Sequence, residues 1–302
     1  MPPPLLVLVV NWNGRELLAD CLGSVLESRY PALKVVMVDN GSRDDSVTFV
    51  RDRYPAVEVI EAAENLRWAG GNNLVLRELM TAGESDRFVL LLNNDTIVPG
   101  GSLERLVQAL VAEPSAWVAT PRICYAHDPA RAWYDGGRVG KYSGWIQHDG
   151  IRQLTGKLPA ETRFVDYGTG CALLLSPTAL REVGTLDERF YFYGEDTDYC
   201  LRIRAAGGKI LHVPRALVLH KVSAALGQES PQKTYLRSRS HIKLLQRHWP
   251  RSRVVQLAIC QIGYFGGLLA WHLWGGRWQT ALAAIEGVID ELRGADNDSI
   301  GS

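Results

Sequence analysis

The N-terminal part of the chain alternates short apolar runs with segments of helical spacing, and this alternation limits the fold more than any other feature. Residues 5–10 are almost wholly apolar, as expected of a strand that is buried on both faces. Residues 16–27 follow with apolar side chains at helical spacing. The alternation continues with predicted strands at 34–38, 57–60 and 88–92 and predicted helices at 46–54 and 70–80. It predicts an α/β fold with a parallel sheet and helices on both faces.

The chain beyond residue 117 is less regular. Residues 118–165 are rich in glycine and aromatic side chains, and we expect a short strand followed by a hairpin there. Later segments predict a strand at 165–175 interrupted by Gly168-Thr169-Gly170, a helix at 196–206, a strand at 209–213 and helices from 230 to about 293. The 302 residues therefore accommodate an α/β domain at 1–225 and a helical region at 226–302 that ends in a polar tail.

Positive and negative charges are equal in number but unevenly placed. The formal net charge is +0, yet no acidic residue occurs between Glu229 and Glu286. The same stretch contains eight basic residues, which are Lys233, Arg237, Arg239, Lys243, Arg247, Arg251, Arg253 and Arg277. Such separation predicts an anionic partner for the C-terminal third. No nucleic-acid-binding module accompanies the basic residues, so we expect no nucleic acid partner.

The cysteines and the N-terminus favour a reducing compartment. The five cysteines are scattered without a CxxC pair, which argues against a zinc site or a disulfide framework. The apolar run at 5–10 has neither a basic segment before it nor a small-residue cleavage site after it. We therefore expect no secretion signal and a cytoplasmic location.

Two polar clusters stand at the carboxyl ends of predicted strands. Asp39-Asn40-Gly41 ends the second strand and Asn93-Asn94-Asp95 ends the fourth. Ligands of open α/β sheets bind beyond these ends. Asp95, flanked by amides, has the oxygen chemistry of a divalent-metal ligand, although Asn and Asp also favour ordinary turns. Asp39 could likewise accept a hydrogen bond from a base imide or begin a turn.

Three carboxylates occur together at the start of a predicted helix, and they are Glu195, Asp196 and Asp198. Capping and the helix dipole explain one or two acidic residues at such a position. Paired carboxylates can also divide their tasks, so that one is held by hydrogen bonds and the other takes a proton. His220 follows the apolar run 216–219, where an imidazole serves either as a structural group or as a metal ligand.

The glycine-rich segment Gly70-Gly71-Asn72-Asn73 precedes a predicted helix and could bring backbone amides close to a phosphate or a sugar. It lacks the GxGxxG pattern, and no GxxxxGKS/T sequence occurs, so a dehydrogenase or a P-loop NTPase has little support. The absence of GxSxG argues against a hydrolase of the nucleophile-elbow type.

In their order along the chain, these clusters resemble the inverting family 2 glycosyltransferases of the GT-A fold. The resemblance is strongest to the branch with bacterial rhamnosyltransferases and related enzymes of cell-surface polysaccharide synthesis. It covers roughly residues 5–222 and rests on ordered blocks at 9–13, 38–42, 65–73, 91–95, 168–171, 190–202 and 220. One position differs from the frequent DxD metal motif, because Asn93 stands first and leaves Asp95 as the carboxylate ligand.

The resemblance implies a GT-A, Rossmann-like mixed sheet with helices on both faces and a nucleotide-diphosphate sugar as donor. The implied donor-binding residues are Asn11, Asp39, Asn65, Arg67, Gly70, Asn73 and Asn94. Asp95 and His220 would bind Mn²⁺ or Mg²⁺, which stabilises the charge of the leaving diphosphate. Asp196 would be the general base, with Glu195 orienting the acceptor and Asp198 supporting the helix start. One base without a covalent intermediate predicts inversion at the anomeric carbon.

The resemblance favours dTDP-L-rhamnose as donor, with a UDP-hexose as the alternative. The implied acceptor is a hydroxyl of a glycan or of a lipid-linked saccharide. A nucleotidyltransferase would need a basic, Gly-rich loop for a triphosphate, and residues 11–15 are a weak substitute for one. A non-catalytic carbohydrate-binding relative should have lost its acidic positions, whereas Asp39, Asp95, Glu195 and Asp196 are all present.

Residues 254–276 contain no charged side chain and are long enough to span a bilayer. However, they include Gln256, Gln261, His272 and five glycines, which suit a spanning helix poorly. Tryptophans at 271, 274 and 278 and flanking arginines favour an interfacial helix, peripheral on the inner face of the plasma membrane. A packing helix at a homodimer interface and a true span are the other interpretations.

Overall fold

The computed structural model describes residues 2–83, 86–222 and 230–294, which fall into two compact units. Unit 1 comprises Met1–Arg138, Gln147–Asp187 and Asp196–Val222. Unit 2 comprises Val139–Ile146, Glu188–Glu195 and Ser223–Ser302. The predicted domain boundary at residue 225 lies outside the described residues and stays a prediction.

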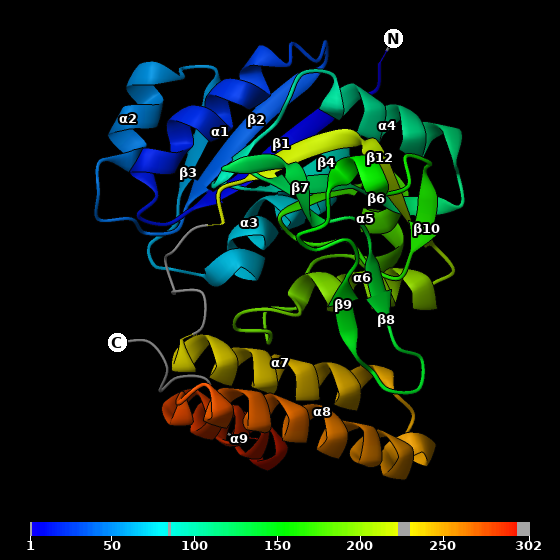
Figure 1. The fold of residues 1–302 in the computed structure, drawn as a ribbon. Helices are drawn as coiled ribbons and strands as arrows, with labels where there is room; N and C mark the ends of the chain where they lie inside the picture. Colours follow the sequence, from blue (N-terminus) through cyan, green and yellow to red (C-terminus); the bar gives the residue numbers. More distant parts are fainter. Residues whose placement is uncertain (1, 84–85, 223–229, 295–302) are drawn as a thin grey trace. The chain divides into compact units, whose positions relative to one another are not determined.

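Unit 1 is built on a ten-stranded sheet with the order β10-β12-β6-β11-β4-β1-β2-β3, to which β5 and β7 add at β12 and β6 (Figure 1). The strands are β1 (Leu5–Asn11), β2 (Leu33–Asp39), β3 (Val57–Glu61), β4 (Phe88–Asn93), β5 (Thr96–Ile97), β6 (Ala116–Tyr125), β7 (Asp128–Tyr134), β10 (Arg163–Val165), β11 (Ala172–Leu175) and β12 (Lys209–His220). The first four strands pair in parallel. β11 runs antiparallel to both β4 and β6, so the sheet is mixed, as predicted.

Helices cover both faces of this sheet, as predicted. Figure 1 shows α1, α2 and α4 on one face and α3, α5 and α6 on the other. The helices are α1 (Arg15–Glu27), α2 (Ser46–Arg53), α3 (Arg67–Thr81), α4 (Ser102–Ala112), α5 (Pro177–Val183) and α6 (Glu195–Ala205), with a single 3₁₀ turn at Thr155–Lys157. Successive residues of β1 point to opposite faces, and Leu6, Val7 and Leu8 are all at most 1% exposed. Burial on both faces explains why this strand is apolar throughout.

The predicted interrupted strand at 165–175 is wrong. Its two ends belong to different strands, because β10 pairs with β12 whereas β11 pairs with β4 and β6. The segment between them leaves the sheet in a loop where Gly168 packs directly against Leu173 and Thr120. A side chain at residue 168 would overlap both neighbours, so the glycine there serves a close approach.

The predicted strand at 209–213 is too short. β12 continues to His220 alongside β6, with a shift in register between Val213 and Leu217. Pro214 lies within this shift and lacks the N–H group that a regular ladder uses. The proline hid the continuation in the sequence, and the correction makes His220 the last residue of a sheet strand. The expected hairpin after residue 118 is present as β6 and β7, followed by the two-stranded ribbon β8 (Gly137–Val139) and β9 (Ile146–His148).

Unit 2 is helical, as predicted for the C-terminal region. Its helices are α7 (Pro231–His248), α8 (Val254–Trp274) and α9 (Trp278–Arg293), with a 3₁₀ turn at Arg251–Arg253. Ile242 and Leu245 of α7 form a small core with Leu257 of α8, against which Phe265 and Val288 pack. Gly287 of α9 lies so close to α7 that a Cβ atom would overlap the Tyr235 carbonyl oxygen.

Candidate active site

Three of the predicted donor-binding side chains meet at the carboxyl ends of neighbouring strands. Asn11 ends β1 and lies in register with Asp39 at the end of β2. The Asn11 Nδ2 donates to Asp39 Oδ1 at 3.1 Å, and Asn94 Nδ2 donates to Asn11 Oδ1 at 2.8 Å. Asn11 and Asp39 are only 0% and 3% exposed. Parallel pairing of β1 with β2 and β4 thus creates a buried chain of amide and carboxylate groups.

Asp39 also forms the turn that the sequence allowed as its simpler role. Ser42 donates its backbone N–H to Asp39 Oδ2 at 2.9 Å and its hydroxyl to Oδ1 at 2.6 Å. Within the described chain, Oδ1 accepts from two side chains and Oδ2 from one backbone group. A carboxylate oxygen can accept a further hydrogen bond, so the turn and recognition of a base imide are compatible.

The start of α3 is held in an unusual backbone conformation. Arg67 has φ +64°, which is uncommon for a residue with a side chain. Asn65 Oδ1 accepts from the Arg67 N–H at 2.9 Å, and Asn40 Nδ2 donates to the Arg67 carbonyl at 2.9 Å. Two of the predicted residues, Asn65 and Arg67, therefore lie together. The sequence interpretation treated Asn40 only as part of a turn and missed its role in fixing Arg67.

Asn73 lies apart from this network. Its side chain is fully buried, and its Nδ2 and Oδ1 bond the carbonyl and N–H of Leu186, both at 3.0 Å. The amide thus ties α3 to the segment that follows α5, and contact of Asn73 with a donor stays a prediction. Gly70 is buried in α3, and the neighbouring Gly71 has no Cβ atom, which would come 2.8 Å from Val10 Cγ1. Here the glycine serves helix–sheet packing.

Asp95 and His220 are brought together although 125 positions separate them. His220 Nε2 lies 3.1 Å from Asp95 Oδ2, and the two residues are 7% and 6% exposed. Trp133 of β7 packs edge-on against the His220 ring with centroids 4.6 Å apart. No hydrogen-bond partner of His220 Nδ1 occurs among the described residues. No role was predicted from the sequence for Trp133, which lies in the aromatic-rich segment 118–165.

The Asp95–His220 pair fits a divalent cation. A carboxylate oxygen and an imidazole nitrogen suit Mn²⁺ or Mg²⁺, ions that take remaining ligands from water and substrate phosphates. No group of three or more His, Cys, Asp or Glu residues suited to a metal occurs among the described residues. Burial raises the pKa of the nearby Cys21 thiol to about 12, and the Asp95 charge adds to this. The Cys21 thiol is therefore neutral near pH 7.

Asp196 lies in the first turn of α6 and is half-buried. Its Oδ2 accepts from the Gly170 N–H at 2.8 Å, and its Oδ1 accepts from the Thr197 N–H at 2.6 Å. Burial raises the pKa of this carboxyl above its ordinary value, although these hydrogen bonds oppose the rise. A carboxylate with a raised pKa is a better proton acceptor.

The loop at 168–171 links Asp196 to the end of β4. Gly170 donates to Asp196, and the carbonyl of the next residue, Cys171, accepts from the Asn93 N–H at 3.0 Å. A Cβ atom on Gly170 would lie 2.9 Å from the Trp68 ring, so the loop passes close to α3 as well. One short loop thereby connects the end of β4, the start of α3 and the start of α6.

The other two carboxylates of the acidic block differ from Asp196. Asp198 is fully buried and accepts from Arg202 Nε at 2.8 Å, one helical turn later. Arg202 also donates to the carbonyls of Val183 and Thr185, so Asp198 serves the packing of α6. Glu195 is the first residue of α6 and belongs to unit 2, and its contact with an acceptor stays a prediction.

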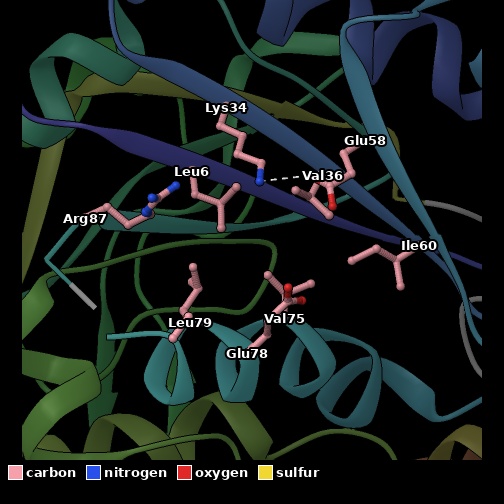
Figure 2. A pocket seen from close by; sticks show the side chains of 10 residues that line it. Leu6, Lys34, Val36, Glu58, Ile60, Val75, Glu78, Leu79 and Arg87 are labelled. Carbon is pink, nitrogen blue, oxygen red and sulfur yellow. Dashed lines mark ion pairs between the residues drawn. The ribbon is translucent and has the colours of Figure 1, made fainter. Parts of the chain in front are cut away.

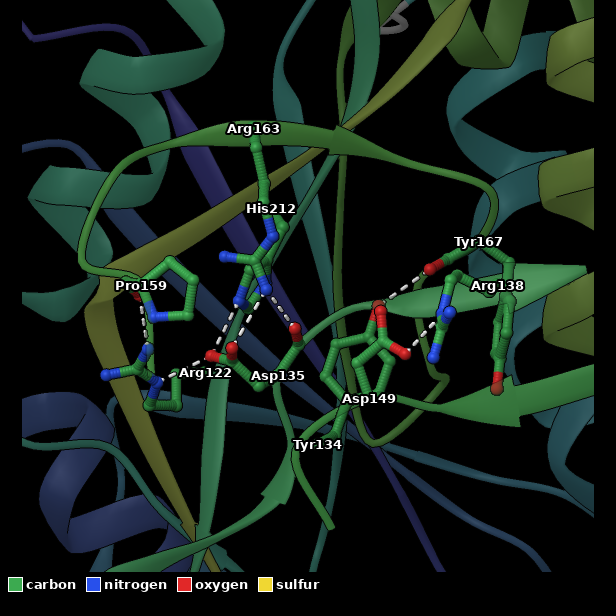
Figure 3. Close-up of polar contacts among 9 residues, drawn as sticks. All are labelled: Arg122, Tyr134, Asp135, Arg138, Asp149, Pro159, Arg163, Tyr167 and His212. Atoms are coloured by element: carbon green, nitrogen blue, oxygen red, sulfur yellow. Dashed lines mark hydrogen bonds and ion pairs between the residues drawn. The ribbon is translucent and has the colours of Figure 1, made fainter. Parts of the chain in front are cut away.

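A second buried carboxylate centre, around Asp135, was not predicted (Figure 3). Asp135 is 1% exposed and bonds Arg122 Nε at 2.6 Å, Arg163 Nη2 at 2.8 Å and His212 Nε2 at 3.1 Å. Although burial opposes the shift, hydrogen bonds from His212 and Arg122 lower the pKa of Asp135 to about 2. Its partners come from β6, β10 and β12, and nothing in the spacing of the sequence indicates that they meet.

A hollow elsewhere in unit 1 lies between α3 and the strands β1, β2 and β3 (Figure 2). Leu6, Val36 and Leu79 line it, and Lys34 Nζ pairs with Glu58 Oε2 at 2.8 Å at its edge. None of the predicted site residues lines this hollow. The candidate site is therefore the polar cluster at the strand ends.

The mixed sheet with helices on both faces has the GT-A fold, which solved glycosyltransferases share. Mannosyltransferase PcManGT from Pyrobaculum calidifontis, solved with GDP-Man and Mn²⁺, superposes with a TM-score of 0.63 at 15% identity and covers 98% of this chain and 89% of its own. GalNAc-T7, solved with UDP, GalNAc and Mn²⁺, gives a TM-score of 0.60 at 16% identity and covers 82% of this chain and 48% of its own.

The chain belongs to the family described as glycosyltransferase like family 2, whose profile matches residues 2–238. It is accordingly a glycosyltransferase. An N-acetylglucosaminyl-diphospho-decaprenol L-rhamnosyltransferase from Mycobacterium tuberculosis is 27% identical over 270 residues, which cover 82% of this chain and 86% of that protein.

Proposed function

We propose that this glycosyltransferase moves L-rhamnose from dTDP-L-rhamnose to a hydroxyl of a lipid-linked saccharide, in the synthesis of a cell-surface polysaccharide. The observation that carries the proposal is the meeting of Asp95 with His220 at 3.1 Å beside the strand-end amides. The activity for which the mycobacterial relative is named supports the sugar and the lipid-linked class of acceptor. A lipid-linked acceptor is consistent with a cytoplasmic enzyme that works at the inner membrane surface.

At the donor end, Asp39 accepts a hydrogen bond from the base imide, while Asn11 and Asn94 keep its carboxylate in place. Asn65 and Arg67 line the donor at the start of α3, next to Gly70. Asp95 and His220 would hold Mn²⁺ or Mg²⁺, which when bound would supply positive charge against the diphosphate that leaves. The support for this arrangement is that Asn11–Asp39, Asn94–Asn11 and Asp95–His220 each lie within hydrogen-bond distance, and that the first and the last of these pairs are buried.

At the acceptor end, Asp196 takes the proton of the acceptor hydroxyl. The acceptor oxygen forms its bond to the anomeric carbon while the bond from that carbon to the diphosphate oxygen breaks. Gly170 and Thr197 hold the carboxylate during this step through their N–H groups. Attack from the face opposite the leaving group inverts the anomeric carbon, and Glu195 orients the acceptor.

Calorimetry with dTDP, UDP, GDP and ADP, each with and without Mn²⁺, tests the donor half of the proposal. We expect Mn²⁺-dependent binding of dTDP, with the other nucleotides at least tenfold weaker. Preferential binding of UDP would replace the rhamnose donor with a UDP-hexose. Asp128→Asn provides a control variant that should bind nucleotide like the wild type, because Asp128 is a half-exposed acid that pairs with Arg131 at the surface at 3.1 Å. Binding of no nucleotide by folded protein would contradict the proposal.

A further inference from the structure

The polarity of α8 is reversed relative to an ordinary surface helix. Of its 21 residues, Leu257, Gln261 and His272 are the buried ones, and two of these three are polar. Gln261 Nε2 donates to the Ser143 carbonyl at 2.7 Å, and its Oε1 lies 2.8 Å from His241 Nε2. The large apolar side chains are instead exposed, namely Val254 62%, Val255 70%, Ile259 66%, Ile262 74%, Leu273 58% and Trp274 92%. A helix that buries polar side chains against the protein and exposes apolar ones has the pattern expected for contact with lipid.

α9 shows the same reversal in a regular form. Its small residues Ala281, Ala284 and Gly287 are buried, and Gly287 packs against α7. Its large apolar residues recur at intervals of four and three on the outer side, namely Trp278, Leu282, Ile285, Ile289 and Leu292. These five side chains are between 38% and 62% exposed. Together with the exposed residues of α8 they form the apolar face of unit 2, which is larger than scattered surface residues explain.

The charges around this face favour an anionic lipid surface over a second copy of the chain. Arg251 and Arg253 precede α8, Arg277 follows it, and residues 230–285 contain no acidic side chain. Of the acids in α9, Asp290 accepts from the Tyr235 hydroxyl, Glu291 pairs with Arg239, and Glu286 is exposed. The Arg277 guanidinium lies 4.0 Å from the centroid of the Trp271 ring, a pairing typical of the membrane interface. Two copies meeting through this face would bring like charges together, whereas anionic headgroups complement them.

The neighbours of α8 favour an orientation in the membrane plane. By length and composition, one helical stretch in the described part of the chain, Arg251–Trp274, could cross a bilayer, with mean hydropathy 1.5 and 11% of that window buried. However, α8 shares its small core with α7 and α9, whose Arg239 and Glu291 form an ion pair at 3.2 Å. Helices that carry these charges would have to enter the hydrocarbon with a spanning α8.

We propose that α8 and α9 bind in the plane of an anionic lipid bilayer through the apolar face of unit 2. The lipid surface is the partner that a lipid-linked acceptor requires, but the inference stands on unit 2 alone and holds for any sugar. Unit 2 also contains the segment Glu188–Glu195, where Ser240 Oγ donates to the Phe192 carbonyl at 2.9 Å and Lys243 Nζ to the Arg189 carbonyl at 2.8 Å. That segment continues directly into Asp196, so the lipid-binding unit also holds the chain that enters the acceptor end.

Vesicle flotation of the full-length chain tests the inference. We expect binding to phosphatidylglycerol/phosphatidylcholine vesicles, at least tenfold weaker binding to phosphatidylcholine alone, and loss of binding at high salt. Ile262→Ser with Trp274→Ser should weaken binding at least tenfold without loss of folding, because both side chains are exposed. Arg251→Glu with Arg277→Glu should do the same, because these arginines flank α8, whereas Ile151→Ser, an exposed apolar residue of unit 1, should have no effect.

Other outcomes would overturn the inference. Absence of vesicle binding, with a dimer in solution that Ile262→Ser and Trp274→Ser dissociate, would assign the face to a second copy. Equal binding to neutral and anionic vesicles would remove the role of the arginines. Nucleotide calorimetry on the same sample keeps the two proposals separate, because vesicle binding without nucleotide binding would contradict the proposed function and leave this inference intact.

Discussion

The donor end and the acceptor end of the site are held by different kinds of contact. At the donor end, Asn11, Asp39 and Asn94 bond to one another through their side chains, and strand pairing sets their register. At the acceptor end, Asp196 is held by the backbone N–H groups of Gly170 and Thr197, together with the Thr197 hydroxyl at 3.2 Å. Substitution of Asn11, Asp39 or Asn94 therefore deprives a neighbouring side chain of its hydrogen-bond partner. A substitution of Asp196 leaves the donating backbone groups in place.

Because of this difference, the residues proposed to bind the donor and the residue proposed to act as base are positioned by different parts of unit 1. Because strand register sets the positions of Asn11, Asp39 and Asn94, the geometry of the donor end is maintained whenever the sheet is folded. The position of Asp196 depends on the glycine loop at 168–171 and on the start of α6. Both follow segments that contain little regular secondary structure. The account thus predicts that the two ends can be impaired independently.

The largest expected effect is that of Asp196→Asn on turnover. The amide cannot accept the proton, so we expect kcat to fall about a thousandfold, within the range for a removed general base. Binding of dTDP with Mn²⁺, measured by calorimetry, should change less than about twofold if the base contributes nothing to ground-state binding. Retention of more than about a tenth of wild-type turnover would show that another group is the base.

The next largest effect is expected from Asp135→Asn on stability. The substitution leaves Arg122 and Arg163 beside a neutral group, and breaking such a buried pair costs about 3 kcal/mol or more. Urea unfolding measures this loss, and Asp128→Asn is the exposed control, with an expected loss below about 0.5 kcal/mol.

The lowered pKa of Asp135 gives this prediction a pH dependence. Because its folded pKa is about 2, below the ordinary value of 3.8, its contribution is present near neutral pH and is lost as pH falls through that interval. The wild type and Asp135→Asn should therefore converge in stability at low pH. A constant difference down to about pH 2 would contradict the assignment.

A smaller effect is expected from Asp95→Asn on donor binding. We expect affinity for dTDP in the presence of Mn²⁺ to fall about thirtyfold, in the range for a lost contact of a metal site, and affinity without Mn²⁺ to stay unchanged. Calorimetry and the electron paramagnetic resonance signal of free Mn²⁺ measure the two quantities. Equal Mn²⁺ dependence in wild type and variant would exclude Asp95 from the metal site.

The smallest expected effect is a displacement in the pH profile. Burial raises the pKa of Asp196, and the base must be ionised to act, so kcat/KM should fall as pH decreases through a midpoint above the ordinary aspartate value of about 3.9. Binding of dTDP in the absence of metal should lack this midpoint. A midpoint at or below the ordinary value would contradict the burial of the base.

Most of the sheet and the meeting of Asn11, Asp39 and Asn94 at the strand ends could be predicted from the sequence, because both follow from local pattern. Apolar runs fixed the first four strands, and their polar ends placed Asp39 and Asp95 at one edge of the sheet. The break at Pro214 hid the second half of β12, although the motif order still identified His220. The glycine loop at 168–171 was mistaken for part of a strand, because its close approach to Thr120 is a property of the fold.

Contacts between distant residues outside the motif blocks could not be predicted from the sequence. The ion pairs of Asp135 depend on three strands that meet only in the folded sheet, and the Asn73–Leu186 bonds depend on how α3 faces the segment after α5. The tryptophans and arginines of this region indicated an interfacial helix. Which side chains of α8 and α9 are buried could be learned only from the packing of unit 2. Local pattern specifies elements and motifs, whereas partners are specified by topology.

The most direct test of the account is transfer itself. The protein would be incubated with dTDP-L-rhamnose, Mn²⁺ and an N-acetylglucosaminyl-diphospho-lipid, and the lipid product analysed by mass spectrometry and by NMR of its anomeric centre. The account predicts one added deoxyhexose with inverted configuration, formed by the wild type and absent with Asp196→Asn. Retained configuration, or equal product from the variant, would contradict the central claim. That claim is that Asp196 deprotonates the acceptor hydroxyl, which then attacks the anomeric carbon of the bound donor sugar.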